Sequence, residues 1–243
     1  MSRKRKPVLK WFAMAISFTL LLFALPELFS NNTGESKSIG SVGNGKLENA
    51  HLLPYRGANF RYFSLLSYYL FDNAYTHSRV SQTILEAYQE CEQTCEGTLF
   101  RLMELSHKTG GKMRLHRTHQ NGLSADFMVP KKRGKRQVRL YDILGIWHYL
   151  LDFTDAGKLT FDQTVEIDFE TIGKHILALD KAARNNGLRI KKVLLKIELK
   201  DEFYKTESGQ KVKQKGIYLA KSMSGWTNRV HDDHYHVDFE FID

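Results

Sequence analysis

A chain of 243 residues with 42% hydrophobic and 12% aromatic residues is long enough for one moderate domain and too apolar to be disordered throughout. Its formal net charge is +9, of which residues 1–30 contribute +4 through five cations set against Glu27. The remaining +5 suits an anionic polymer or a membrane surface and does not require nucleic acid as a partner.

The amino terminus has the pattern of an export signal. Its cations are followed by fifteen residues without a charge, 11–25, which end before Pro26. This run is shorter than the roughly 20 apolar residues that span a bilayer comfortably. Leu28 and Ser30 match the small residues of a cleavage site only weakly. Residues 1–30 are therefore predicted to be a signal peptide or a signal anchor, with cleavage after Ser30 and retention in the membrane both open.

The rest of the chain is predicted to be a linker and a single domain. Residues 31–50 are rich in Ser, Asn and Gly, as polar linkers are, and residues 51–243 would form the domain. Periodicity predicts helices within 78–106, 141–153 and 167–185, and strands at 125–129, 193–199, 217–219 and 236–242. Helices mostly precede strands without strict alternation, which predicts an α+β fold with a central antiparallel sheet and flanking helices.

Two smaller features bear on packing. Cys91 and Cys95 lie four residues apart, and a disulfide between them is slightly favoured over two free thiols. Trp147 and His148 lie in an apolar helical stretch and are predicted to belong to the core.

Histidines gather in two short segments. Of the ten histidines, five lie within residues 116–126 and 231–236. In the first segment Gly122 allows the chain to turn, so that His119 and the strand residue Asp126 can point to one place. The second segment alternates as a strand does, which places four polar side chains on one face: His234, His236, Asp238 and Glu240.

These residues contain a ligand set for catalytic zinc. Such sites commonly use three protein ligands from His and carboxylate side chains, with water in the fourth position. His119, Asp126 and His236 provide two imidazoles and one carboxylate. His234 lies next to them, free to exchange a proton with metal-bound water, and His231 and His116 can assist.

The same segments resemble a known family. The motif His116-x-x-His119-Gln-x-Gly122-x-x-x-Asp126, paired with His231-x-x-His234-x-His236, is similar to the penicillin-insensitive murein endopeptidases. These belong to a wider group of lysostaphin-type, D-Ala-D-Ala and hedgehog-type zinc folds. The opening segments 38–45 and 53–54 also resemble the start of the family domain, so the resemblance spans residues 38–243.

The resemblance implies an enzyme that cleaves D-alanyl cross-links between peptidoglycan stem peptides in the periplasm. It further implies Zn²⁺ held by His119, Asp126 and His236, with His116 close to or on the metal and His234 and His231 in catalysis. The membrane would be a partner only through an amino-terminal anchor, and the oligomeric state stays open.

The sequence also departs from relatives in ways that keep alternatives open. Asp233 lies three residues before His236, where D-Ala-D-Ala peptidases place a glutamate base, so it competes with His234 for that role. A D,D-carboxypeptidase or dipeptidase on the same fold, or a non-catalytic wall-binding module, are therefore the alternatives. Asp155 and Lys158 stand where some relatives have a second Asp-x-x-His metal pair, which predicts one metal.

Two weaker signals are present in the sequence. Ser208 and Lys211 have the Ser-x-x-Lys spacing of serine penicillin-binding enzymes. We interpret the spacing as coincidence, because the Gly- and Lys-rich context predicts a hairpin turn and not the start of a helix. The basic run 131–139 is interpreted as a solvated loop, with docking of stem-peptide carboxylates as the functional alternative.

Overall fold

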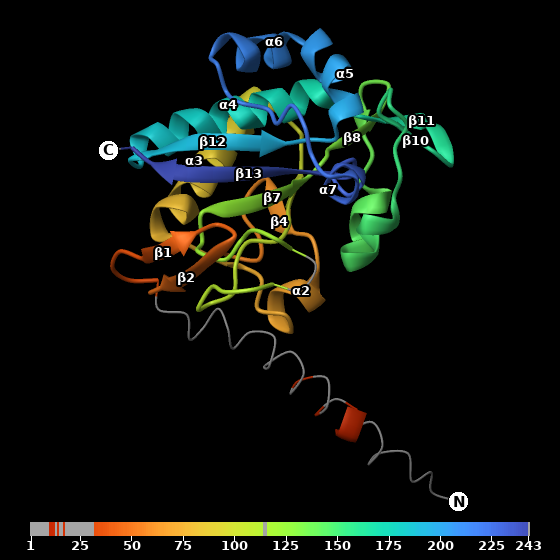
Figure 1. The fold of residues 1–243 in the computed structure, drawn as a ribbon. Helices are drawn as coiled ribbons and strands as arrows, with labels where there is room; N and C mark the ends of the chain where they lie inside the picture. The colour runs from red at the N-terminus through yellow and green to blue at the C-terminus, as the bar shows by residue number, and fades with distance from the viewer. Residues whose placement is uncertain (1–9, 13, 15–16, 18–31, 114–115, 243) are drawn as a thin grey trace, which may run out of the picture. The chain divides into compact units, whose positions relative to one another are not determined.

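The structure is a computed structural model that describes residues 10–12, 14, 17, 32–113 and 116–242 (Figure 1). Contacts divide the chain into Met1–Asn31 and Asn32–Asp243. The predicted export signal at residues 1–30 lies almost wholly outside the described residues. In the part that is described, no helix has both the length and the apolar character needed to cross a bilayer.

The second unit is one mixed α+β domain built on a five-stranded sheet. Its strand order is β12 (Leu188–Leu194), β13 (His234–Phe241), β7 (Ser124–Met128), β6 (Phe100–Leu102) and β4 (Phe60–Tyr62). Neighbouring strands are antiparallel except β4 and β6, which run parallel. The predicted antiparallel sheet with flanking helices is thus confirmed, with a parallel pair at one edge.

The central strands follow the sequence pattern closely, and the outer segments do not. The strands predicted at 125–129 and 236–242 are confirmed as β7 and β13 to within two residues. The predicted strand 193–199 instead begins at Leu188, ends at Leu194 and is followed by the short 3₁₀ turn η2 (Ile197–Leu199). Of residues 217–219, Leu219 forms an isolated bridge to Val193.

Two long helices pack against this sheet and against each other. They are α3 (Ser78–Thr94) and α4 (Phe169–Asn185), and α4 runs along β12 (Figure 1). Capping side chains start both, because the His77 ring accepts from the Arg79 amide and the Asp168 carboxylate from the Thr171 amide. Of the segment 78–106, in which helices were expected, the helix ends at Thr94 and residues 100–102 form strand β6.

Smaller elements complete the domain. Two short helices, α5 (Lys200–Lys205) and α6 (Glu207–Gln214), pack on α4, and the remaining short helices are α2 (Leu65–Tyr69) and α7 (Gly225–Arg229). A second sheet contains β10 (Lys158–Leu159), β11 (Asp162–Ile167), β8 (Lys131–Arg133) and β9 (Arg136–Gln137). A separate two-stranded sheet pairs β3 (His51–Leu52) with β5 (Tyr75–Thr76). The helix predicted at 141–153 is a 3₁₀ segment, η1 (Leu140–Leu150), kinked at Gly145.

The structure differs from the predicted linker at residues 31–50. Residues 37–48 form the hairpin of β1 (Lys37–Ser41) and β2 (Asn44–Glu48). Leu47 is buried, its amide donates to the Thr109 carbonyl at 3.0 Å, and the Ser38 hydroxyl donates to the Asn121 carbonyl at 2.6 Å. These contacts make the hairpin part of the domain, where composition alone indicated a tether.

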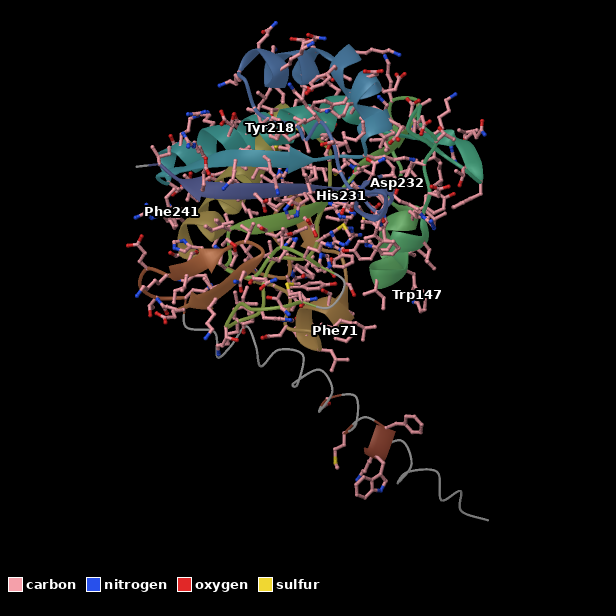
Figure 2. The ribbon with its side chains drawn as sticks, in the orientation of Figure 1. Phe71, Trp147, Tyr218, His231, Asp232 and Phe241 are labelled. Atoms are coloured by element: carbon pink, nitrogen blue, oxygen red, sulfur yellow. The ribbon has the colours of Figure 1, made fainter. Side chains whose placement is uncertain are left out.

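Three further predictions need correction. Cys91 and Cys95 are both buried free thiols, so the favoured disulfide is wrong. Trp147 is 63% exposed and points outward from η1 (Figure 2), whereas its neighbour His148 is fully buried as predicted. Ser208 lies in the first turn of helix α6 and is not in a hairpin turn. Its hydroxyl is buried and donates to the Glu170 carbonyl at 2.7 Å, so it is not available as a nucleophile.

Gly122 makes the turn that leads into β7. Its φ is +77°, and an added Cβ would lie 2.7 Å from the His77 amide nitrogen. Its carbonyl accepts from the Thr76 hydroxyl at 2.8 Å, which fixes the turn against β5. The predicted turn is therefore confirmed, and the structure adds a close approach that only glycine permits.

We expect Gly122→Ala to destabilise the domain more than Gly111→Ala does. Both residues have positive φ, but an added Cβ at Gly111 has nothing within 4 Å. The left-handed conformation should cost about 1–2 kcal/mol at each position, and overpacking should add about 1–3 kcal/mol at Gly122 alone. Urea unfolding measures both. Equal losses of stability would contradict the close approach at Gly122.

Candidate functional site

The register between β7 and β13 brings the two histidine-rich segments together. In this antiparallel pair Asp126 lies directly opposite His236. Side chains opposite each other share one face of the sheet and lie within contact distance. The His236 Nδ1 and the Asp126 Oδ1 are 2.7 Å apart. Two residues separated by 110 positions in sequence thus meet because of strand pairing.

His236 lies between two carboxylates. Its Nε2 is 2.7 Å from the Asp238 Oδ1, and both side chains are almost completely buried. Burial alone would lower the pKa of His236, but Asp238 and Asp126 outweigh it and raise that pKa to about 10. Asp238 lies two positions along the strand, on the same face as His236, and therefore holds the His236 ring in place.

Asp126 is the carboxylate at which the donors meet. Its Oδ2 lies 3.2 Å from the His119 Nε2 and 3.6 Å from the His116 Nδ1. Burial alone would raise the pKa of Asp126, but His119 and His236 together hold it well below its usual range. Asp126 is consequently ionised in a site where a second positive charge would be stabilised.

His119 carries the clearest sign of a missing partner. It is 1% exposed, and among the described residues neither of its ring nitrogens has a hydrogen-bond partner, although Asp126 is near. Its φ is +69°, a strained value for a residue with a side chain. Buried polar atoms are almost always satisfied, so two unpaired nitrogens at one imidazole indicate a site for a ligand.

The donor set fits a metal ion. One ligand atom each of His116, His119 and Asp126 lies within 4.8 Å of the others. The His236 ring is adjacent, with its centroid 4.8 Å from that of His119, but its two nitrogens face Asp126 and Asp238. The four predicted ligand residues are therefore gathered, and the three that converge most closely include His116, which sequence reasoning placed beside the metal.

The other predicted catalytic residues lie at the edge of this cluster. The His231 and His234 rings are 4.7 Å apart, and the His231 ring is 6.2 Å from that of His236. Burial, and then the nearby His234 and His236, lower the pKa of His231 to about 3, so it is a neutral imidazole. Figure 2 shows His231 at the centre of the domain beside Asp232.

Asp233 is held by two imidazoles. Its Oδ1 is 2.6 Å from the His234 Nδ1, and its Oδ2 is 3.2 Å from the His148 Nδ1. Burial would lower the pKa of His234, but Asp233 outweighs it and raises that pKa. The two residues that the sequence left as competing bases are thus directly hydrogen-bonded to each other.

Sequence reasoning missed Glu104 and Tyr149. Glu104 follows β6, and its carbonyl accepts from the Asp126 amide at 2.9 Å. Its buried carboxyl accepts from the Tyr149 hydroxyl, and the Tyr149 ring meets the His234 ring edge-on at 5.5 Å. Glu104 is a single acid in the run Leu-Met-Glu-Leu and has no spacing pattern that marks it. Its partners are distant in sequence, Tyr149 in η1 and Ser67 in α2.

The Glu104 carboxyl should make stability depend on pH. Burial, and to a smaller extent the Asp126 charge, raise the pKa of Glu104 from 4.5 to about 7. A folded-state pKa above the unfolded value means that its contribution to stability is complete below about pH 4.5 and is lost as pH rises through about 7. We expect the metal-free protein to lose about 2–3 kcal/mol of stability between about pH 5 and pH 8 that Glu104→Gln does not lose.

Urea unfolding at both pH values measures this difference. Glu92→Gln, at an exposed position of α3, is the matched control and should behave as the parent does. The same pH dependence in the Glu104→Gln protein and in the parent would contradict a carboxyl that takes up a proton on folding.

Comparison with known proteins agrees with this arrangement. A search among curated proteins finds no match. A sequence model of the penicillin-insensitive murein endopeptidases matches residues 38–241. This range includes both histidine-rich segments, all of the hairpin of β1 and β2 except Lys37, and all strands of the five-stranded sheet. The chain therefore belongs to the family of penicillin-insensitive murein endopeptidases.

Proposed function

We propose that this chain is a zinc peptidase that hydrolyses D-alanyl cross-links between peptidoglycan stem peptides. The family supplies the murein endopeptidase activity. The observation that carries the zinc part is His119, a buried imidazole with two unpaired nitrogens beside the ionised Asp126. Mixed His and carboxylate ligands are typical of catalytic zinc.

The metal would be held by His119, Asp126 and His236, with His116 as an additional or alternative ligand. His236 must lose its proton to bind, since imidazole ligates only when neutral. When bound, zinc polarises a carbonyl and lowers the pKa of coordinated water towards neutrality. The finer proposal of a fold like that of D-Ala-D-Ala and hedgehog-type proteins rests on the resemblance of the two histidine-rich segments.

The chain's own residues supply the proton transfer. His234 has its Nδ1 on Asp233, which leaves Nε2 to accept a proton from the nucleophilic water and to give one to the leaving amine. The neutral His231 lies beside it with its Nδ1–H donated to the Thr227 carbonyl at 2.5 Å, so its Nε2 is an acceptor that can orient the nucleophilic water. Asp233 then orients His234 and stabilises its charged form.

Digestion of purified muropeptides tests this function. We expect cross-linked dimers to be converted to monomers, a chelator to stop the reaction, and β-lactams to leave it unchanged, because the Ser208 hydroxyl is buried against Glu170. Mass spectrometry identifies the products. Loss of the terminal D-Ala from monomeric pentapeptides with dimers left intact would favour a carboxypeptidase, and binding without cleavage would favour a wall-binding module.

His234→Ala should retain its metal and lose about 10²–10⁴-fold in kcat, the usual contribution of a general base. Asp233→Ala should lose less, because it acts through His234. His107→Ala, outside the cluster, is the control for loss of an imidazole. A His234→Ala enzyme nearly as active as the parent, together with an inert Asp233→Ala enzyme, would make Asp233 the base.

We further propose that residues 1–30 direct the domain across the inner membrane to the periplasm, where its substrate lies. The basic cluster and the uncharged run 11–25 support this. Cell fractionation and sequencing of the mature amino terminus distinguish a released protein that starts near Asn31 from one tethered with its amino terminus intact. Recovery of the intact chain in the cytosol would contradict export.

A further inference from the structure

A chain of buried polar groups runs from His234 away from the metal donors. Asp233 joins His234 to His148, and the His148 Nε2 is 3.1 Å from the Lys131 Nζ. The Lys131 side chain is 0% exposed and that of His148 is 0% exposed. Neither residue is one of the proposed zinc ligands. The solvated loop expected for the basic run 131–139 is wrong at Lys131, which lies in β8 with a buried side chain.

Lys131 makes three contacts with its ammonium group. Besides His148, the Nζ donates to the Val129 carbonyl at 3.1 Å and forms an ion pair with the Asp142 Oδ1 at 2.9 Å. An ammonium has three N–H donors and no acceptor. All three are therefore used, and the His148 Nε2 must be the acceptor in its contact.

The Lys131 donor fixes the proton of the His148 ring and thereby leaves the Asp233 carboxylate as an acceptor for His234. Because the His148 Nε2 accepts, its Nδ1 carries the hydrogen and donates to the Asp233 Oδ2. Burial, and then Lys131, lower the pKa of His148, which agrees with a neutral ring. The Asp233 Oδ1 accepts from the His234 Nδ1–H, so the neutral form of the His234 ring has its lone pair on Nε2.

We propose that Lys131 and His148 are positioning residues that act through Asp233 to hold His234 in the tautomer with a free Nε2. The role assigned to His234 rests on the proposed function, whereas the tautomer does not. The donors converge on Asp233: Lys131 donates to His148, His148 donates to the Asp233 Oδ2, and His234 donates to the Asp233 Oδ1. A carboxylate that receives a hydrogen on Oδ2 stays an acceptor for the His234 Nδ1–H. The tautomer of the His234 ring is set by the hydrogen bond that its Nδ1 makes to Asp233.

The packing of η1 agrees with this role. Consecutive residues of η1 reach the same place, since His148 donates to Asp233 while the Tyr149 ring packs edge-on against His234. Charged groups on other elements also face this chain. Asp142 and Arg101 lie beside Lys131, and Glu104 lies beside Tyr149. Of these groups, the Asp142 carboxylate forms the ion pair that compensates the buried ammonium of Lys131.

Substitutions of His148 separate positioning from packing. The Asn side-chain amide lies where the imidazole Nδ1 does, so His148→Asn can keep the donor to Asp233 and lose the contact with Lys131. His148→Gln places its amide near the Nε2 position, so it keeps the contact with Lys131 and loses the donor to Asp233. We expect kcat to fall about tenfold to a hundredfold in His148→Gln, with KM little changed, and to be largely retained in His148→Asn.

Nitrogen-15 spectra of histidine-labelled protein give a readout that does not need activity. At a pH above the raised pKa of His234, where its ring is neutral, the parent should show a protonated Nδ1 and an unprotonated Nε2 at His234, and His148 should show the same tautomer. His148→Gln should convert His234 to a mixture of tautomers. Signals are assigned by their loss in His234→Asn and His148→Asn.

The outcomes separate the two proposals. A parent His234 with its proton on Nε2, or equal effects of the Asn and Gln substitutions on kcat and spectra, would overturn the positioning role. If the predicted tautomer is found but muropeptides are not cleaved, the proposed function fails and the positioning of His234 stands. If the Gln variant does not fold, the parent spectrum still decides the tautomer.

Discussion

The site depends on one strand register. Pairing of β7 with β13 sets Asp126 opposite His236, and a shift by one residue would send every side chain of one strand to the other face of the sheet. The register is held by burial on both faces, since Val237 and Phe239 are as inaccessible as His236 and Asp238. The core thus determines where the side chains of the candidate metal site lie.

Burial also explains why the charges of the site are paired. Three carboxylates, those of Asp126, Asp233 and Asp238, are at most 2% exposed, and each contacts at least one imidazole. An unpaired charge at such depth would be strongly destabilising. The exception is His119, whose two ring nitrogens lack a hydrogen bond among the described residues although Nε2 lies 3.2 Å from Asp126, and this is the position at which a bound cation would complete the arrangement.

Local pattern predicted the parts of the site that lie on one strand or one turn. Alternation predicted that His234, His236 and Asp238 share a face, and the glycine predicted the turn at Gly122, because both are properties of neighbouring residues. Strand pairing across 110 positions was inferred only from the chemistry of the ligands. Contacts made by η1 were not predicted, since Trp147 and His148 look equally apolar in sequence, yet one is exposed and the other contacts Asp233.

Predictions from composition were wrong where tertiary contacts determine the local structure. The Ser- and Gly-rich residues 37–48 form a hairpin because Leu47 finds a buried place, and the basic residue Lys131 is buried because Asp142, Val129 and His148 satisfy its ammonium. In both cases a residue distant in sequence supplies what the local pattern lacks.

Anomalous diffraction at the zinc absorption edge, measured on crystals of the protein as purified, tests the central claim most directly. The account predicts one strong peak within bonding distance of His119, Asp126 and His236, with His116 beside or on it. A peak held without Asp126, or no peak in protein that cleaves muropeptides, would contradict a zinc centre built on the pairing of β7 and β13.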